Sequence, residues 1–150
     1  MIVYKKGDVL KSGETLIVHG CNCKNTMAAG IARQVRTQCP NAYAADRATI
    51  CGDIKKLGTF TYALEDNGMC IFNAYTQYNY NRNVLCLDYE ALEKSISSIC
   101  EWIRQYQQGE SHLAMPKIGC GLAGGDWKIV SEILERVSDK YNMEFRVYEL

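Results

Sequence analysis

Two stretches of this sequence, rich in glycine and alanine, have the residue types that bind phosphate groups. The first runs from His19 to Ala32, reads His-Gly-Cys-Asn-Cys-Lys-Asn-Thr-Met-Ala-Ala-Gly-Ile-Ala, and lies between an apolar run and a helical pattern. Small residues let a backbone approach an anion closely, and the first N–H groups of a helix have no partner within it. The stretch therefore fits an anion-binding loop between a strand and a helix. It matches neither a Walker loop nor GxGxxG, and a plain turn explains it equally well.

The second stretch runs from Met115 to Trp127 and reads Met-Pro-Lys-Ile-Gly-Cys-Gly-Leu-Ala-Gly-Gly-Asp-Trp. A chain that only has to turn needs one or two glycines, whereas N–H groups wrapped round a diphosphate need several residues without Cβ atoms. Two such loops at the carboxyl ends of strands would form a crevice of the kind in which α/β sheets bind ligands. Together they favour a ligand with a diphosphate over a purely structural role.

Several reactive side chains lie in these loops, and each has a structural alternative. His19 could act as a general acid or base near neutral pH, or buried partners could satisfy its ring. Asp126 could orient a water molecule, or it could cap the helix that follows. Cys120 could be a nucleophile or a small filler residue. Cys21 and Cys23 could suggest a metal, but two thiols without further ligands do not complete a zinc shell, so neither a metal nor a cofactor is expected.

Composition limits the class of protein. The chain has 150 residues, which predicts one domain over residues 1–150. Its 17 basic and 17 acidic residues give no net charge, which argues against a broad nucleic-acid-binding surface. The eight cysteines include no CxxC pair, and neither a signal peptide nor an apolar run long enough to cross a membrane is present. We expect a soluble, cytoplasmic monomer with reduced thiols.

The periodicity of apolar residues predicts an α/β fold, in which a mixed sheet has helices on both faces. Asn67-Gly68 predicts a hairpin turn, Asp88 an N-cap and Gly109 a C-cap. The stretch from Tyr75 to Cys86 has no clear pattern. The predicted strands are Met1–Lys5, Thr15–His19, Thr59–Leu64, Met69–Tyr75, His112–Ile118 and Met143–Tyr148, and the predicted helices are Ile31–Gln38, Ala42–Cys51, Asp88–Tyr106 and Asp126–Asp139.

Both loops, together with Lys6-Gly-Asp-Val9 near the start, resemble the macro domain family, whose members bind ADP-ribose. The resemblance covers nearly the whole chain and implies a three-layer α/β/α fold. Gly-Cys-Gly-Leu followed by Asp-Trp is similar to the branch of ADP-ribosyl-glutamate hydrolases and DNA-ADP-ribose glycohydrolase antitoxins. His-Gly-Cys-Asn-Cys followed by Gly-Ile-Ala is similar instead to yeast and phage ADP-ribose 1″-phosphate phosphatases.

The resemblance also implies residue roles. Asp8 would accept a hydrogen bond from the adenine amino group, Val9 would donate one from its backbone, and Asn22 would hold the distal ribose. The implied ligand-binding residues are Asp8, Val9, Gly20, Cys21, Asn22, Met27, Ala28, Ala29, Gly30, Ile31, Ala32, Lys117, Ile118, Gly119, Cys120, Gly121 and Leu122, and the catalytic candidates are His19, Asn22 and Asp126.

At two positions this sequence differs from the glutamate hydrolases, and both differences argue against their lysine-dependent activity. Those enzymes use a lysine after the middle strand, but Ala74–Asn79 contains none, and Ala123 stands where they have aspartate. The sequence therefore favours a metal-independent phosphatase acting on ADP-ribose 1″-phosphate, in which His19 would activate water or protonate the leaving oxygen. The alternatives are a hydrolase that removes ADP-ribose or an acyl group, and a non-catalytic reader of ADP-ribose.

Overall fold

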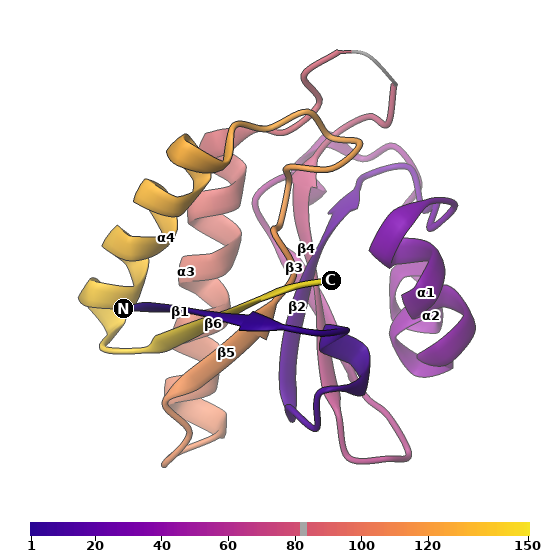
Figure 1. Cartoon of the computed structure of the whole chain (residues 1–150). Helices are drawn as coiled ribbons and strands as arrows, with labels where there is room; N and C mark the ends of the chain where they lie inside the picture. Colours follow the sequence, from indigo (N-terminus) through magenta and orange to yellow (C-terminus); the bar gives the residue numbers. More distant parts are fainter. Residues whose placement is uncertain (82–83) are drawn as a thin grey trace.

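The computed structural model describes residues 1–81 and 84–150 and has an α/β architecture (Figure 1). The strands are β1 (Ile2–Lys6), β2 (Leu16–Asn22), β3 (Phe60–Leu64), β4 (Cys70–Gln77), β5 (His112–Met115) and β6 (Glu144–Glu149). The α-helices are α1 (Gly30–Gln38), α2 (Pro40–Arg47), α3 (Tyr89–Tyr106) and α4 (Trp127–Tyr141), and 3-10 turns span Val9–Lys11 and Ile54–Lys56.

The six strands form one mixed sheet in the order β1-β6-β5-β2-β4-β3. Every neighbouring pair is parallel except β3 with β4, which is the hairpin predicted from Asn67-Gly68. Because β2, β4 and β5 are adjacent and parallel, the loops that follow them leave the same edge of the sheet. The topology thus brings the two glycine-rich loops to one place.

Helices cover both faces of the sheet, which confirms the predicted α/β class with a mixed sheet. In Figure 1, α3 and α4 lie on one side of the sheet and α1 and α2 on the other. Each face has its own apolar core: Val18, Phe72 and Leu113 pack toward α3 and α4, whereas Ile17 and Ile71 pack toward α1 and α2. Since β2 lies between these two cores, both faces of this strand are buried.

Three strand or helix ends differ from the sequence predictions by three or more residues, and the other ends by at most two. Strand β2 continues to Asn22 rather than ending at His19, because its pairing with β4 runs on to Asn22 and Gln77, so the first four residues of the predicted first loop belong to the strand. Helix α2 ends at Arg47 rather than Cys51, because the backbone N–H and the hydroxyl of Thr49 both bond the Asp46 carbonyl in a terminating turn. Strand β5 ends at Met115 rather than Ile118, because Pro116 has no N–H to continue the ladder. The C-cap of α3 is Gln107, not Gly109.

The stretch from Tyr75 to Cys86 had no predicted pattern. In the structure, β4 runs on to Gln77, and residues 82–83 lie outside the described residues.

Candidate functional site

The loop after β2 presents a run of backbone donors. Within residues 1–81 and 84–150, no hydrogen bond uses a backbone N–H of residues 25–32 as its donor. Helix α1 starts at Gly30, and its N-cap, Ala29, has no side-chain group that could bond the first turn. These N–H groups also lie at the positive end of the helix dipole. The loop can therefore offer several donors to an anion.

In the loop after β5, hydrogen bonds between glycine residues hold the two ends of the turn together. Gly125 N–H donates to the Gly119 carbonyl at 2.8 Å, and Gly124 N–H donates to the Gly121 carbonyl at 3.1 Å. A Cβ atom at Gly125 would lie 2.5 Å from the Gly119 oxygen, so this position requires glycine. A Cβ atom at Gly121 would meet nothing within 4 Å, so open space lies in front of Gly121.

This second loop also has unused donors and a fixed position. No hydrogen bond within the described part of the chain uses the N–H groups of residues 121–123. The Ala123 carbonyl accepts hydrogen bonds from Cys86 N–H at 2.9 Å and Leu87 N–H at 3.2 Å, which attach the loop to the segment before α3. The loop can thus offer three successive N–H groups to an anion, and the segment before α3 holds it in place.

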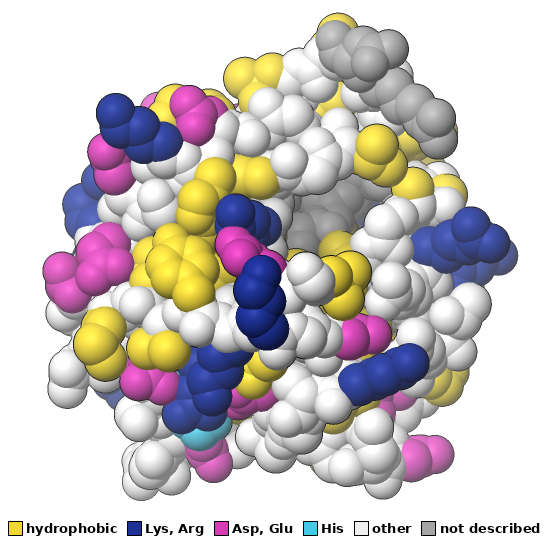
Figure 2. Space-filling view, in the orientation of Figure 1, with side chains coloured by type: hydrophobic (Ala, Val, Ile, Leu, Met, Phe, Trp, Pro, Cys, Tyr) yellow, Lys and Arg dark blue, Asp and Glu magenta, His cyan; other side chains and the backbone are white. Residues whose placement is uncertain are grey.

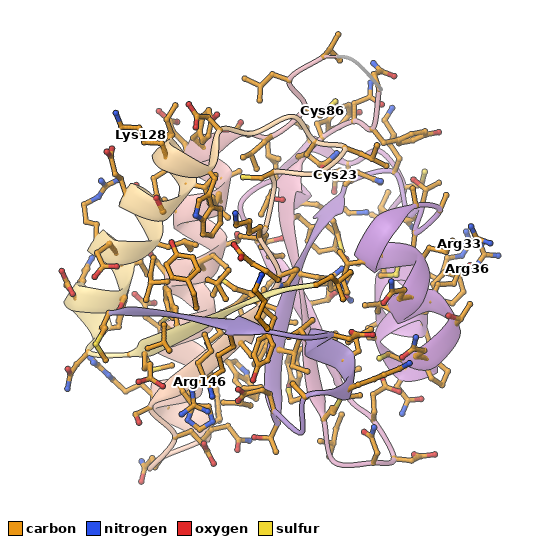
Figure 3. All side chains as sticks on the ribbon, in the orientation of Figure 1. Cys23, Arg33, Arg36, Cys86, Lys128 and Arg146 are labelled. Carbon is orange, nitrogen blue, oxygen red and sulfur yellow. The ribbon has the colours of Figure 1, made fainter. Side chains whose placement is uncertain are left out.

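Cationic side chains of the helices that follow the loops point elsewhere. Figure 3 shows Arg33 and Arg36 of α1 and Lys128 of α4 directed outward, away from the sheet. Lys117, expected to bind ligand, forms an ion pair with Glu149 at 2.8 Å, and its ammonium lies 5.6 Å from the Trp127 ring centroid. Lys24, within the first loop, has its ammonium 4.7 Å from the Tyr78 ring centroid. Among the described residues, backbone N–H groups are therefore the main donors that the two loops offer to an anion.

Asn22 organises the first loop. Its Nδ2 donates to the Thr26 carbonyl at 3.0 Å, and its Oδ1 accepts hydrogen bonds from Lys24 N–H at 2.8 Å and the Thr26 hydroxyl at 3.2 Å. The side chain is 9% exposed. These bonds fix the chain just before the run of free donors. One N–H of the Asn22 amide is left over for a ribose hydroxyl.

Asp8 lies at the end of β1 and begins the short turn Val9–Lys11. Its Oδ1 accepts a hydrogen bond from Leu10 N–H at 3.0 Å, which holds the carboxylate in a fixed orientation. Val9 and Leu10 pack into the core on the α1 side of the sheet. The backbone that carries the carboxylate is therefore held by the core. The second carboxylate oxygen remains available to accept a hydrogen bond from an amino group.

His19 lies inside the protein rather than in the crevice. Its ring is 1% exposed, and its Nε2 lies 2.7 Å from Oδ1 of Asn73, the residue opposite it on β4. Asn73 in turn donates to the Ala42 carbonyl of α2 and to the Thr61 hydroxyl, each at 3.0 Å. Burial lowers the pKa of His19 from 6.5 to about 4, against the opposing effect of the bond to Asn73. These contacts favour the structural alternative, in which buried partners satisfy a neutral ring.

The other reactive candidates also have structural partners. Asp126 caps α4 by accepting a hydrogen bond from Lys128 N–H at 2.9 Å, and its own N–H donates to the Tyr89 hydroxyl. Burial raises the pKa of Cys120 to about 11 and raises the pKa of Cys21 well above its ordinary value, so both thiols are protonated at neutral pH. The geometry thus favours a helix-capping role for Asp126 and a structural role for Cys120 as a small filler residue.

Two buried polar residues that hold the first loop were not predicted from the sequence. Asn25 has a left-handed backbone, and Lys56, 31 residues further on, donates to its side chain. Asn25 lies in the first of the two loops, and asparagine tolerates φ above zero, so a left-handed conformation at this position is predictable from the sequence. Nothing local marks Lys56, because its partners are distant in sequence.

In the face that Figure 2 shows, Lys and Arg side chains are spread among Asp and Glu side chains. A cavity of about 310 Å³, lined by Tyr62, Leu64 and Trp102 among others, contains none of the predicted site residues. In the described part of the chain, no group of three or more His, Cys, Asp or Glu side chains could hold a metal ion, and no helix is long and apolar enough to span a membrane.

Comparison with known proteins gives relatives over the full chain, although no family model matches. The chain is 34% identical to an uncharacterised 17.5 kDa protein of Enterobacteria phage T4, with 93% of this chain and 92% of that protein covered. It is 30% identical to an ADP-ribose 1″-phosphate phosphatase of Saccharomyces cerevisiae, with coverage of 99% and 98%. It is 29% identical to the ADP-ribose glycohydrolase OARD1 of Bos taurus, with coverage of 99% and 91%.

The fold matches that of a solved macrodomain. The macrodomain of Mycobacterium tuberculosis DarG superposes with a TM-score of 0.81 at 21% identity and covers 100% of this chain and 98% of its own. Two relatives at 30% identity or more match this chain over nearly its whole length. The order of the strands and the two strand-to-helix loops are consistent with the same family. This chain belongs to the macro domain family.

Proposed function

We propose that this protein binds ADP-ribose between the two loops and hydrolyses a derivative carried on the distal ribose, with ADP-ribose 1″-phosphate as the favoured substrate. The observation that carries the proposal is the run of unused N–H groups over residues 25–32, together with those of residues 121–123 in the loop that leaves the same edge of the sheet. A diphosphate and a terminal phosphate are the groups that such donors bind best. The name of the yeast relative supports the choice of substrate.

Hydrolysis of the phosphate ester requires no covalent bond between the substrate and the protein. Water attacks phosphorus, the bond between phosphorus and the ribose oxygen breaks, and that oxygen leaves with a proton while inorganic phosphate is released. Most of the catalysis in phosphoryl transfer comes from positioning and from stabilising the charge on the phosphoryl oxygens. The loop N–H groups supply the donors, and Asn22, fixed by Thr26 and Lys24, would orient the ribose.

A glycohydrolase is the second candidate, because the bovine relative has that name. The segment Ala74–Asn79 argues against a lysine-dependent mechanism of this type. Gln77, the residue in this segment that ends β4, donates to the Asn79 carbonyl and cannot replace an amine. A non-catalytic reader would use the same loops without turnover.

Turnover of a substrate panel tests the proposed function. We expect the purified protein to release inorganic phosphate from ADP-ribose 1″-phosphate without added metal and in the presence of EDTA, because N–H donors neutralise the phosphate charge. ADP-ribosyl protein, ADP-ribosylated DNA and O-acetyl-ADP-ribose complete the panel. Faster release from any of these three would identify the rival hydrolase. Tight ADP-ribose binding with no turnover of any substrate would identify a reader.

Base preference tests the role of Asp8. We expect Asp8→Asn to weaken ADP-ribose binding about tenfold, since the amide can keep the bond to Leu10 N–H but presents a donor to the adenine amino group. The parent should prefer ADP-ribose to GDP-ribose, because guanine has a carbonyl oxygen where adenine has its amino group. Isothermal titration calorimetry measures both. Equal affinities of the parent for the two ligands would remove Asp8 from the adenine site.

A further inference from the structure

We propose that Lys56 and Asn25 form a clamp that holds the loop after β2 in its anion-binding form, which makes Lys56 a positioning residue for the ligand although it lies outside both loops. The inference rests on the proposed function, since the loop is taken to bind ADP-ribose. Lys56 belongs to the 3-10 turn Ile54–Lys56 and bonds the loop through the Cys23 carbonyl.

The ammonium of Lys56 is buried and all its bonds are to protein. The side chain is 8% exposed, and Nζ donates to the Cys23 carbonyl at 3.1 Å, the Ile50 carbonyl at 3.1 Å and the Thr49 hydroxyl at 2.8 Å, as well as to Oδ1 of Asn25. An ammonium has three N–H donors, so these four acceptors saturate it. Burying a charge is unfavourable unless its bonds are replaced in this way. Lys56 therefore has no donor left for a ligand, and any effect on binding must act through the loop.

Asn25 is the loop residue on which the clamp acts. Its φ is +57°, in the left-handed region, and its side chain is 7% exposed. Nδ2 donates to the Thr49 carbonyl at 2.8 Å, while Oδ1 accepts a hydrogen bond from Lys56. The side chain thus fixes a backbone conformation that most residues with a Cβ adopt only rarely.

The position of the clamp explains why it should affect the ligand. Asn25 is the first residue in the run of unused N–H groups, and Cys23, whose carbonyl Lys56 binds, precedes it by two residues. Gly52 N–H also donates to the Cys23 carbonyl, at 2.7 Å, and Cys23 N–H donates to the Tyr78 carbonyl at 3.1 Å. None of these bonds uses an N–H group of residues 25–32, so they leave those donors free. A loop fixed before binding avoids the entropic cost of ordering it on the ligand.

The test compares Lys56→Met with Lys55→Met in the full chain. The two substitutions remove the same charge from adjacent residues, but Lys55 is exposed and its ammonium is outside the clamp. We expect Lys56→Met to weaken ADP-ribose binding by about tenfold or more and Lys55→Met to leave the affinity within about twofold of the parent value. AMP should bind Lys56→Met within about twofold of the parent, because AMP lacks the distal ribose and second phosphate that the clamped loop would hold.

A second variant keeps the proposal testable if Lys56→Met does not fold. Asn25→Gly removes the amide but retains a residue that favours positive φ, so the backbone conformation stays accessible. It should show the same selective loss for ADP-ribose over AMP. In the double variant the two losses should not add, because both remove the same bond.

The outcomes separate this inference from the proposed function. A parent protein that does not bind ADP-ribose contradicts the function itself. A parent that binds, with folded Lys56→Met and Asn25→Gly variants that bind equally well, overturns the clamp and leaves the function intact. A parallel loss of ADP-ribose and AMP affinity, together with a lower melting temperature, would show general destabilisation and also overturn it.

Discussion

Replacing Gly121 by glutamate is expected to weaken ADP-ribose binding by about a hundredfold or more while the protein stays folded. A Cβ atom at Gly121 meets nothing within 4 Å, so the fold can accept a side chain. The new carboxylate would lie in the open space in front of the unused N–H groups of residues 121–123, where the diphosphate would bind. Two like charges about 4 Å apart repel by about 4 kcal/mol near a protein surface, which would correspond to nearly a thousandfold in affinity. Calorimetry with ADP-ribose measures this loss.

Three matched variants separate charge, size and loop geometry at this site. Gly121→Gln has the size of glutamate without its charge and should retain much more affinity, and high salt should restore part of the binding of Gly121→Glu. Gly125→Ala should instead disrupt the loop itself, because its Cβ would lie 2.5 Å from the Gly119 oxygen. Unchanged affinity in a folded Gly121→Glu protein would remove this loop from the binding site.

The positions of both loops follow directly from the sequence. An apolar run, small residues and a helical pattern predict a strand, a turn and a helix in that order, and parallel strands in one sheet place such turns at the same edge. The structure shows this arrangement for the loops after β2 and β5. The uncapped start of α1 could also be predicted, because Ala29 has no side-chain acceptor.

The direction of the His19 side chain could not be predicted in this way. In a strand with one exposed face, the alternation of polar and apolar residues shows which side chains point inward. Both faces of β2 are covered by helices, so six of its seven residues are buried and no alternation remains. Only the tertiary structure shows that His19 faces Asn73 and α2.

Lys56 illustrates a second limit of sequence analysis. A lysine in a short turn is normally exposed, and its partners Cys23 and Asn25 are 33 and 31 residues away. Bonds of this range depend on how α2 packs against β3 and β4 and on the path of the turn that follows it, which local propensity does not determine. The loop itself was therefore predictable, whereas the residue that fixes its conformation was not.

The environment of His19 predicts that the free energy of unfolding falls by about 2 kcal/mol between pH 7 and pH 5 through this residue alone. Burial lowers the pKa of the folded protein's His19 from 6.5 to about 4. The folded state therefore keeps the ring neutral over this range, while the unfolded chain takes up a proton as the pH drops below 6.5. Because the unfolded state binds more protons, acid favours unfolding. Urea titrations at pH 7 and pH 5 measure the effect.

A His19→Gln variant isolates this contribution and also decides the catalytic role. Glutamine can still bond Asn73 but does not titrate, so its unfolding free energy should change less between pH 7 and pH 5 than that of the parent, by about 2 kcal/mol. Since a buried neutral ring transfers no proton to a ligand in the crevice, kcat per folded molecule should stay within about tenfold of the parent value. A kcat lower by about 10²–10⁴ with ADP-ribose affinity retained would instead establish His19 as the general acid or base. In that case the ring must reach the crevice in a state that differs from this structure, and the pH dependence of kcat should then follow the pKa of His19.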